Sequence, residues 1–328
     1  MLPILRVVAV CSTLAGLSLE DCIGFLLDRS PRSDLTPQGV ALLEANAEIA
    51  LWTRESTPWG PLIPDSVFLR YVLPARVSQE PLVEWRSMLR DSVLPAVEGL
   101  SSIEQAALAV GAWCDERTAY EPTQKRDQSP LVTWRSGIGR CEELTIFYMD
   151  ALRSVGIPCR QAYTPWWSCC DNNHAWTEVW TPDGWKYAES SSAADSLSSA
   201  WFDENVSKAS LVLAIAPDSV PGTLRTLGGA SFVNVTANYT RTGTLTVGDD
   251  TTEVFVSIVN WGSFRTLVRL DEDLRSVELG AGVYMVSWGW PLRTGFVMLL
   301  PGDSLVYYPE ETGHIEGVHL VNVPEVVQ

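Results

Sequence analysis

Three residues in this chain have the types and the order that nucleophilic chemistry needs, namely Cys141, His174 and Glu189. A cysteine attacks an amide carbonyl usefully only as the thiolate, so its pKa must be lowered by an imidazole, a cation or a helix N-terminus. The chain holds three histidines, and two of them, His314 and His319, lie in a polar run near the C-terminus. His174 is therefore the candidate base, and the Glu189 carboxylate would orient the imidazole and stabilise the imidazolium. This set predicts a cysteine acyl-transfer site.

The residues after Cys141 predict a helix that begins at this cysteine. Apolar residues recur at spacings of three and four until Gly156 and Pro158, namely Leu144, Phe147, Tyr148, Ala151, Leu152 and Val155. A helix start would place unpaired backbone N–H groups and the positive end of the helix dipole at the sulfur, where they could also bind an oxyanion. The neighbouring Arg140 either adds a cation or pairs with the two acids that follow the cysteine.

The position of Glu189 depends on the turn between two predicted strands. His174 begins one strand, and the Pro-Asp pair after Thr181 turns the chain back antiparallel. If Thr181 pairs with Gly184, Glu189 lies diagonal to His174 on the same face, at a Cβ separation of roughly 7 to 8 Å. A three-residue loop would instead put Glu189 on the other face.

Other residues near His174 are secondary candidates. Asp171 and Asp195 are the alternatives for the orienting carboxylate. Trp166 and Trp167 precede His174 in a loop-like stretch and could bind substrate, whereas aromatic residues around strands usually belong to a core.

The segments around these residues predict helices first and strands later. Thr36 and Pro37 are typical of a helix start, and the proline-rich stretch 58–74 forbids long regular structure, so we expect it to wrap across a partner surface. Strand patterns begin at Cys159, and beyond about residue 220 the chain is strand-like throughout, with glycine-containing turns. This order predicts a mixed core followed by a β-sandwich.

Composition excludes several classes of function. Hydrophobic residues make up 46% of the chain and charged residues 19%, which predicts a folded globular protein. The formal net charge of -17 opposes binding to phosphates, so we expect no nucleic-acid partner. The sequence has no apolar run long enough to span a membrane. The seven cysteines include no C-x-x-C pair, so neither a disulfide scaffold nor a thiol metal site is expected.

The N-terminal residues leave two interpretations open. Residues 1–16 contain one arginine, an apolar run and small residues, as a short signal segment does, and a buried N-terminal helix would fit them as well. We prefer export to the periplasm or the extracellular space over a cytoplasmic location.

Several separated motifs carry a family resemblance. The run SGIGRCEELTIFYMDALRSVGIPCR, then NHAWTEVW, then GWKYAE resembles the transglutaminase-like superfamily over roughly residues 100–215. The resemblance implies Cys141 as nucleophile, His174 as base and Glu189 at the position usually held by Asp. It also implies a tryptophan near the oxyanion, for which Trp113 and Trp134 are the candidates. The wider pattern, which includes YTPWW and SAWF, is similar to bacterial exported proteins in which such a core precedes a β domain.

The sequence therefore predicts an α+β fold with a papain-like or transglutaminase-like core, in which helices pack on an antiparallel sheet. The expected parts are a candidate signal segment (1–16), a helical and proline-rich wrapping segment (17–100), the core (101–216) and a β-sandwich (225–328). The expected function is acyl transfer on a peptide or carboxamide through a thioester, without cofactor or metal, with hydrolysis preferred to crosslinking. The alternative is an inactive fold that binds peptide or glycan.

Overall fold

The structure, a computed structural model, describes residues 16–123, 127–190, 192–248 and 252–309. Nearly all of the candidate signal segment 1–16 lies outside the described residues, as do His314 and His319. The helices are Leu19–Arg29 (α1), Pro37–Ser56 (α2), Asp65–Tyr71 (α3), Arg86–Val97 (α4), Ile103–Asp115 (α5), Pro130–Ser136 (α6), Cys141–Ser154 (α7) and Asp203–Val206 (α8). None of the helices in these ranges is long and apolar enough to cross a membrane.

The strands fall into a core sheet, a short pair and two C-terminal sheets. Those before residue 240 are Ala119–Tyr120 (β1), Ile138–Gly139 (β2), Cys159–Thr164 (β3), His174–Thr181 (β4), Gly184–Ala188 (β5), Leu213–Ala216 (β6), Thr223–Leu227 (β7) and Ala230–Asn234 (β8). Those after it are Thr242–Val247 (β9), Val254–Asn260 (β10), Ser263–Leu270 (β11), Ser276–Gly280 (β12), Gly282–Trp288 (β13), Arg293–Leu299 (β14) and Ser304–Tyr307 (β15).

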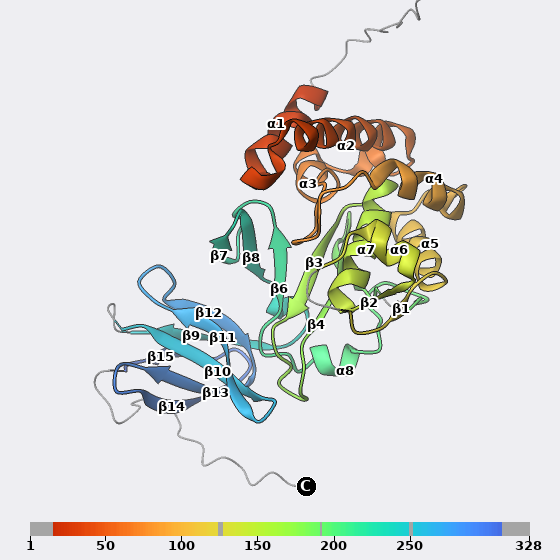
Figure 1. Cartoon of the computed structure of the whole chain (residues 1–328). Helices are drawn as coiled ribbons and strands as arrows, with labels where there is room; N and C mark the ends of the chain where they lie inside the picture. Colours follow the sequence, from red (N-terminus) through yellow and green to blue (C-terminus); the bar gives the residue numbers. More distant parts are fainter. Residues whose placement is uncertain (1–15, 124–126, 191, 249–251, 310–328) are drawn as a thin grey trace, which may run out of the picture.

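The core is an antiparallel sheet with helices packed against it. Its six strands have the order β5-β4-β3-β6-β8-β7, and α7 packs on β3 and β4. Figure 1 shows the N-terminal helices and the β9–β15 strands on opposite sides of this sheet. The predicted α+β fold class is therefore confirmed, with helices and an antiparallel sheet in one core.

The N-terminal helices are part of the same core rather than a separate unit. Buried residues of α1, α2, α4, α5 and α7 belong to one apolar cluster. The proline-rich stretch does wrap over this core, since the Trp59 indole N–H donates to the Val155 carbonyl at 3.0 Å. The stretch also contains the helix α3, which the sequence did not predict. This helix can form among prolines because Pro64 stands just before it, where the missing N–H costs nothing.

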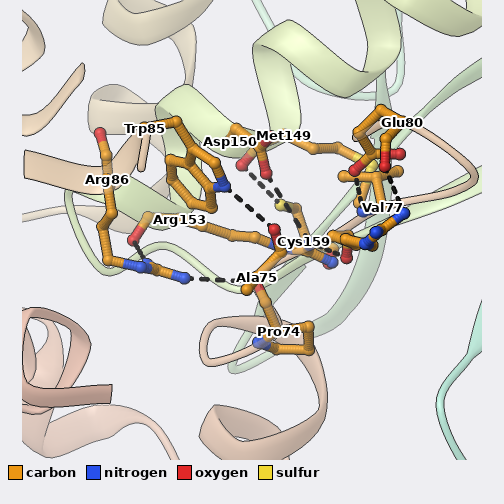
Figure 2. A network of polar contacts seen from close by, with 12 residues as sticks. Pro74, Ala75, Val77, Glu80, Trp85, Arg86, Met149, Asp150, Arg153 and Cys159 are labelled. Carbon is orange, nitrogen blue, oxygen red and sulfur yellow. Dashed lines mark hydrogen bonds and ion pairs between the residues drawn. The ribbon is translucent and has the colours of Figure 1, made fainter. Parts of the chain in front are cut away.

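Where this stretch ends, two arginine side chains donate hydrogen bonds to backbone carbonyls in place of helix or strand partners. The buried Arg86 guanidinium donates to the carbonyls of Val72 and Leu73, and also to that of Arg153 near the end of α7. The Arg153 guanidinium donates in turn to the Tyr71 and Arg76 carbonyls. Figure 2 shows Arg86 and Arg153 with part of this network. Arginine donors thus satisfy carbonyls that no helix or strand partner reaches.

The C-terminal β-sandwich begins later than the sequence predicted. Strands β7 and β8 lie within residues 223–234, and they pair with β6 in the core sheet, although the sandwich was expected to start at 225. The alternating pattern and the glycine turn of these strands would be the same in either sheet. Only the strand that they pair with therefore decides which sheet they join. The sandwich itself packs the sheets β11-β10-β13-β14 and β12-β9-β15 around one apolar cluster.

Candidate active site

Cys141 lies at the N-terminus of α7, as the sequence predicted. Gly137, with a φ of 72°, ends the preceding helix α6. Arg140 then caps α7, and its backbone N–H donates to the Glu143 carboxylate at 2.9 Å. Because nearly every residue of α7 after Glu143 is buried, the helix is fixed and the Cys141 side chain is held at its partly exposed end.

His174 and Glu189 meet beside this helix end. In the β4–β5 hairpin Thr181 pairs with Gly184, the register that the sequence argument required. Glu189 follows β5 directly, and its Oε2 atom lies 3.0 Å from His174 Nε2. Both side chains are buried, with residue exposures of 7% for His174 and 4% for Glu189. Since Glu189 occupies Nε2, the nitrogen that remains for exchanging a proton with a thiol is Nδ1.

Glu189 is itself held by two other donors. The Trp201 indole N–H donates to Glu189 Oε2 at 2.7 Å, and the Ser190 backbone N–H donates to Oε1 at 2.7 Å. The Asp171 carboxylate instead accepts from the Trp261 backbone N–H, and Asp195 is exposed. Glu189 is thus the one of these three candidates that contacts the imidazole.

The electrostatic environment of Cys141 differs from the sequence expectation. Burial and the adjacent Glu142 carboxylate, which accepts a hydrogen bond from the thiol at 3.2 Å, raise the pKa of Cys141 to about 12. The backbone N–H groups of Ala175 and Glu142 lower this pKa, but by less. Arg140 does not compensate, because its guanidinium pairs with Asp127 and Glu143, each at 3.3 Å. The thiol therefore rests protonated, as an N-terminal helix position alone would not predict.

Two cavities adjoin at the site. The polar cavity has a volume of about 710 Å³ and is lined by Arg140, Cys141, Glu142, Asn172, His174 and Trp201, among others. The aromatic cavity also has a volume of about 710 Å³ and is lined by Tyr163, Trp166, Ile215, Phe232, His174 and Glu142, among others. His174 and Glu142 line both cavities. A long substrate could therefore extend from one cavity into the other and lie next to His174 where the two meet.

The predicted substrate-binding tryptophans take different positions. Trp166 is partly exposed and lines the aromatic cavity. Trp167 also lines the polar cavity, but it is 2% exposed, and its ring packs against those of His174 and Trp176 at centroid distances of 6.3 and 6.2 Å. It supports the base more than it offers a surface to substrate.

Trp113 and Trp134 do not line either cavity. Their rings pack on each other at a centroid distance of 5.6 Å, within the helical core. Neither is therefore placed at the oxyanion position that the resemblance implied for one of them.

Two residues with direct roles in this geometry were not among the sequence candidates. Trp201 is 60% exposed, lines the polar cavity and packs against the His174 ring at a centroid distance of 5.0 Å. Glu142 contacts the nucleophile itself. The SAWF motif and the acid next to Cys141 were the available signals, but neither shows from sequence alone where its side chain points.

The described residues contain no cluster of three or more His, Cys, Asp or Glu side chains that could hold a metal ion. The six described cysteines are free thiols, and Cys169 and Cys170 lie exposed beside the polar cavity. Cys114 and Cys159 are buried free thiols, and neither is bonded to that pair.

Several solved structures are similar to this chain. A candidate cysteine protease from Cytophaga hutchinsonii is similar with 11% identity and a TM-score of 0.30, over 69% of this chain and 56% of that one. LapG of Legionella pneumophila has 16% identity and a TM-score of 0.28, over 46% and 76% of the two chains. Red sea bream transglutaminase has 10% identity and a TM-score of 0.37, over 76% and 66%. No curated protein sequence matches the chain.

A helix that begins at a cysteine and packs against an antiparallel sheet carrying histidine and glutamate defines an α+β fold typical of thiol-dependent enzymes. The family model of the transglutaminase-like superfamily matches residues 92–190, which contain all three of these residues. This part of the chain is therefore similar in sequence to the transglutaminase-like superfamily.

Proposed function

We propose that this protein is a thiol hydrolase that cleaves a peptide or carboxamide bond, with Cys141 as nucleophile, His174 as base and Glu189 as orienting carboxylate. The observation that carries the proposal is the 3.0 Å contact between His174 Nε2 and Glu189 Oε2, in the wall of the cavity that Cys141 also lines. The contact fixes the imidazole tautomer with Nδ1 unprotonated, which is the form that can accept the thiol proton.

The reaction would proceed through a thioester. The Cys141 sulfur attacks the carbonyl carbon and forms a C–S bond while the thiol proton passes to His174. His174 gives this proton to the leaving nitrogen as the C–N bond breaks, and an amine departs. Water then adds its oxygen to the acyl carbon and gives a proton to His174, the C–S bond breaks, and the returned proton restores the thiol.

The raised pKa of the thiol determines when the proton moves. Because Cys141 donates to Glu142 in the free protein, few molecules hold a thiolate at neutral pH. A substrate that enters beside Glu142 would have to displace this hydrogen bond, and the proton would then pass to His174 as the sulfur attacks. Glu142 would thus hold the thiol proton in the free protein until an electrophile enters beside it and His174 takes the proton.

The two cavities favour a peptide as substrate. Asn172 and Asn173 line the polar cavity and can hydrogen-bond with a peptide backbone, while Tyr163, Trp166 and Phe232 in the aromatic cavity suit an apolar side chain. A peptide segment presents both kinds of group within a few residues. Hydrolysis is preferred to crosslinking because no feature of the sequence marks a separate site for a second, amine substrate.

Alkylation of the full-length protein by iodoacetamide near pH 6 tests this function, with labelled cysteines identified by mass spectrometry. We expect Cys141 to be labelled in a His174-dependent manner, with the rate roughly 100-fold lower in His174→Ala because the base no longer accepts the proton. Cys170 serves as an internal control, since it lies exposed beside the same cavity and its thiol contacts that of the neighbouring Cys169. Equal rates for Cys141 in both proteins would contradict the proposal.

The second candidate is a peptide-binding module without catalysis. The raised pKa of Cys141 favours it, because a protonated thiol is a poor nucleophile. A peptide-library screen separates the two functions. Cleaved products support the hydrolase, whereas retained, uncleaved peptides together with an inert Cys141 support the binding module.

A further inference from the structure

One buried polar side chain of the β-sandwich contacts the loop that precedes the candidate base His174. Asn260 is the last residue of β10, and it is 1% exposed although it lies at the tip of the β10–β11 hairpin. Its Nδ2 atom lies 2.9 Å from the Trp167 carbonyl oxygen, 3.0 Å from that of Cys170 and 3.3 Å from that of Asn172. Its Oδ1 atom accepts the Asn172 backbone N–H at 3.1 Å.

These contacts use every polar group of the amide. A side-chain NH₂ carries two hydrogens, so three carbonyl acceptors at these distances require one hydrogen to be shared. The Trp167 N–H also donates to the Asn172 carbonyl at 2.9 Å and closes the loop around the amide. Asn260 is thus the inner partner of a loop, residues 167–172, whose backbone has little other regular pairing.

The hairpin turn that carries Asn260 is itself strained. Trp261 has a φ of 53° and Gly262 a φ of 64°, so both central residues of the turn are left-handed. Such two-residue turns favour asparagine and glycine, and a tryptophan in the first position is disfavoured. The same turn aims the Trp261 backbone N–H at Asp171 Oδ1, at 2.5 Å. A costly conformation retained at a contact with the site suggests that the contact has a function.

The loop that Asn260 holds contacts the base from two directions. At its start, the Trp167 ring stacks on His174 at a centroid distance of 6.3 Å. At its end, Asn172, with a φ of 108°, leads through one residue into His174 at the beginning of β4. Cys170, Asp171 and Asn172 also form one wall of the polar cavity. A shift of this loop would therefore move both the imidazole and the cavity wall.

We propose that Asn260 is a positioning residue for His174, through which the β-sandwich completes the catalytic site of the core. This inference rests on the proposed function. It assigns the C-terminal domain a part in catalysis that a domain used only for binding would not have, although Asn260 itself touches neither the thiol nor the imidazole.

The test measures Cys141 alkylation by iodoacetamide near pH 6 in the full chain and in Asn260→Ala and Asn260→Asp. We expect a rate about tenfold lower in both variants, because a misplaced base loses much of its effect. Asn260→Asp keeps the shape of the side chain but directs a carboxylate oxygen at three carbonyl oxygens, so it removes the donated hydrogen bonds without leaving a cavity. Faster hydrogen exchange in the peptide that covers 167–173 should accompany the slower alkylation, since the Asn172 N–H loses its acceptor.

Two controls separate positioning from a general loss of stability. Val256→Ala lies on the same strand, removes a fully buried side chain of the sandwich core and leaves the loop untouched. It should lower the unfolding midpoint but leave alkylation at the wild-type rate. In a His174→Ala background, Asn260→Ala should have no further effect, because the residue that it positions is gone.

Three results would overturn the inference: a wild-type alkylation rate in Asn260→Ala, an equal loss in Val256→Ala, or an Asn260 effect that persists without His174. If wild-type alkylation is already independent of His174, the proposed function fails first. The two failures are therefore distinguishable within one set of proteins.

Discussion

Helix α7 gathers charged residues at both ends, but its two ends place them in opposite environments. At the N-terminal end, Glu142 and Cys141 are partly exposed and face a cavity. At the C-terminal end, Asp150 and Arg153 are buried beneath α4, next to Arg86 (Figure 2). Burial and the nearby Glu80 carboxyl raise the pKa of Asp150 well above its usual range. The same helix thus uses charge to tune a reactive group at one end and to hold the chain together at the other.

The difference follows from what each charge can bind. The two arginines at the buried end donate mostly to backbone carbonyls of residues 71–76, where the chain has little regular structure. Their removal would leave buried acceptors without donors, so their contribution should appear in stability. At the open end, water can replace any lost partner, so substitutions there should change reactivity and leave the fold intact.

The largest effect should come from the buried end. Arg86→Ala removes donors to several buried carbonyls and leaves Asp150 with one cation fewer, so we expect the free energy of unfolding to fall by about 3 to 5 kcal/mol. Urea denaturation followed by circular dichroism measures this change. Arg90→Ala is the matched control, because it is one turn further along α4, partly exposed, and stacks on the exposed Trp52. A similar loss in both variants would contradict the assignment.

A smaller change, in reactivity alone, should follow at the open end. Glu142→Gln removes the carboxylate that favours the protonated thiol, so the pKa of Cys141 should fall from its present value of about 12 and the thiolate fraction at any lower pH should rise. A shift of one pKa unit gives about a tenfold faster alkylation. Iodoacetamide rates measured against pH would show the curve displaced to lower pH.

Glu204→Gln is the control for this displacement, because it removes an exposed carboxylate of α8 that pairs with Lys208 away from the thiol. An unchanged curve in Glu142→Gln would mean that the carboxylate does not set the thiol pKa.

The smallest effect should come from the partner of Glu189. Trp201→Phe keeps an aromatic ring against His174 but removes the indole N–H that donates to Glu189, so Cys141 alkylation near pH 6 should slow by about threefold. Trp290→Phe, at a tryptophan that is 96% exposed in the β-sandwich, should leave the rate unchanged. An alkylation rate in Trp201→Phe equal to that of the wild type would mean that the indole N–H does not contribute to the reactivity of Cys141.

Much of the site geometry could be predicted because it is local. The apolar spacing after Cys141 defined the helix, and the short turn after Thr181 defined the register that brings Glu189 to His174. Each depends on residues within one helix or one hairpin, where 3.6-residue and two-residue periodicity fix directions. The β7–β8 hairpin was assigned to the wrong sheet for the opposite reason, since period-two alternation does not say which neighbour a strand will pair with.

The sequence by itself determined the three candidate reacting residues, their order, and the elements that present them. Only the tertiary structure decided the rest. It placed the half-buried thiol beside Glu142 and so raised its pKa, turned Arg140 toward Asp127, and brought Asn260 against a loop 88 to 93 residues earlier in the chain. Protonation energies and long-range hydrogen bonds depend on which distant surfaces meet and exclude water, and no local pattern encodes that.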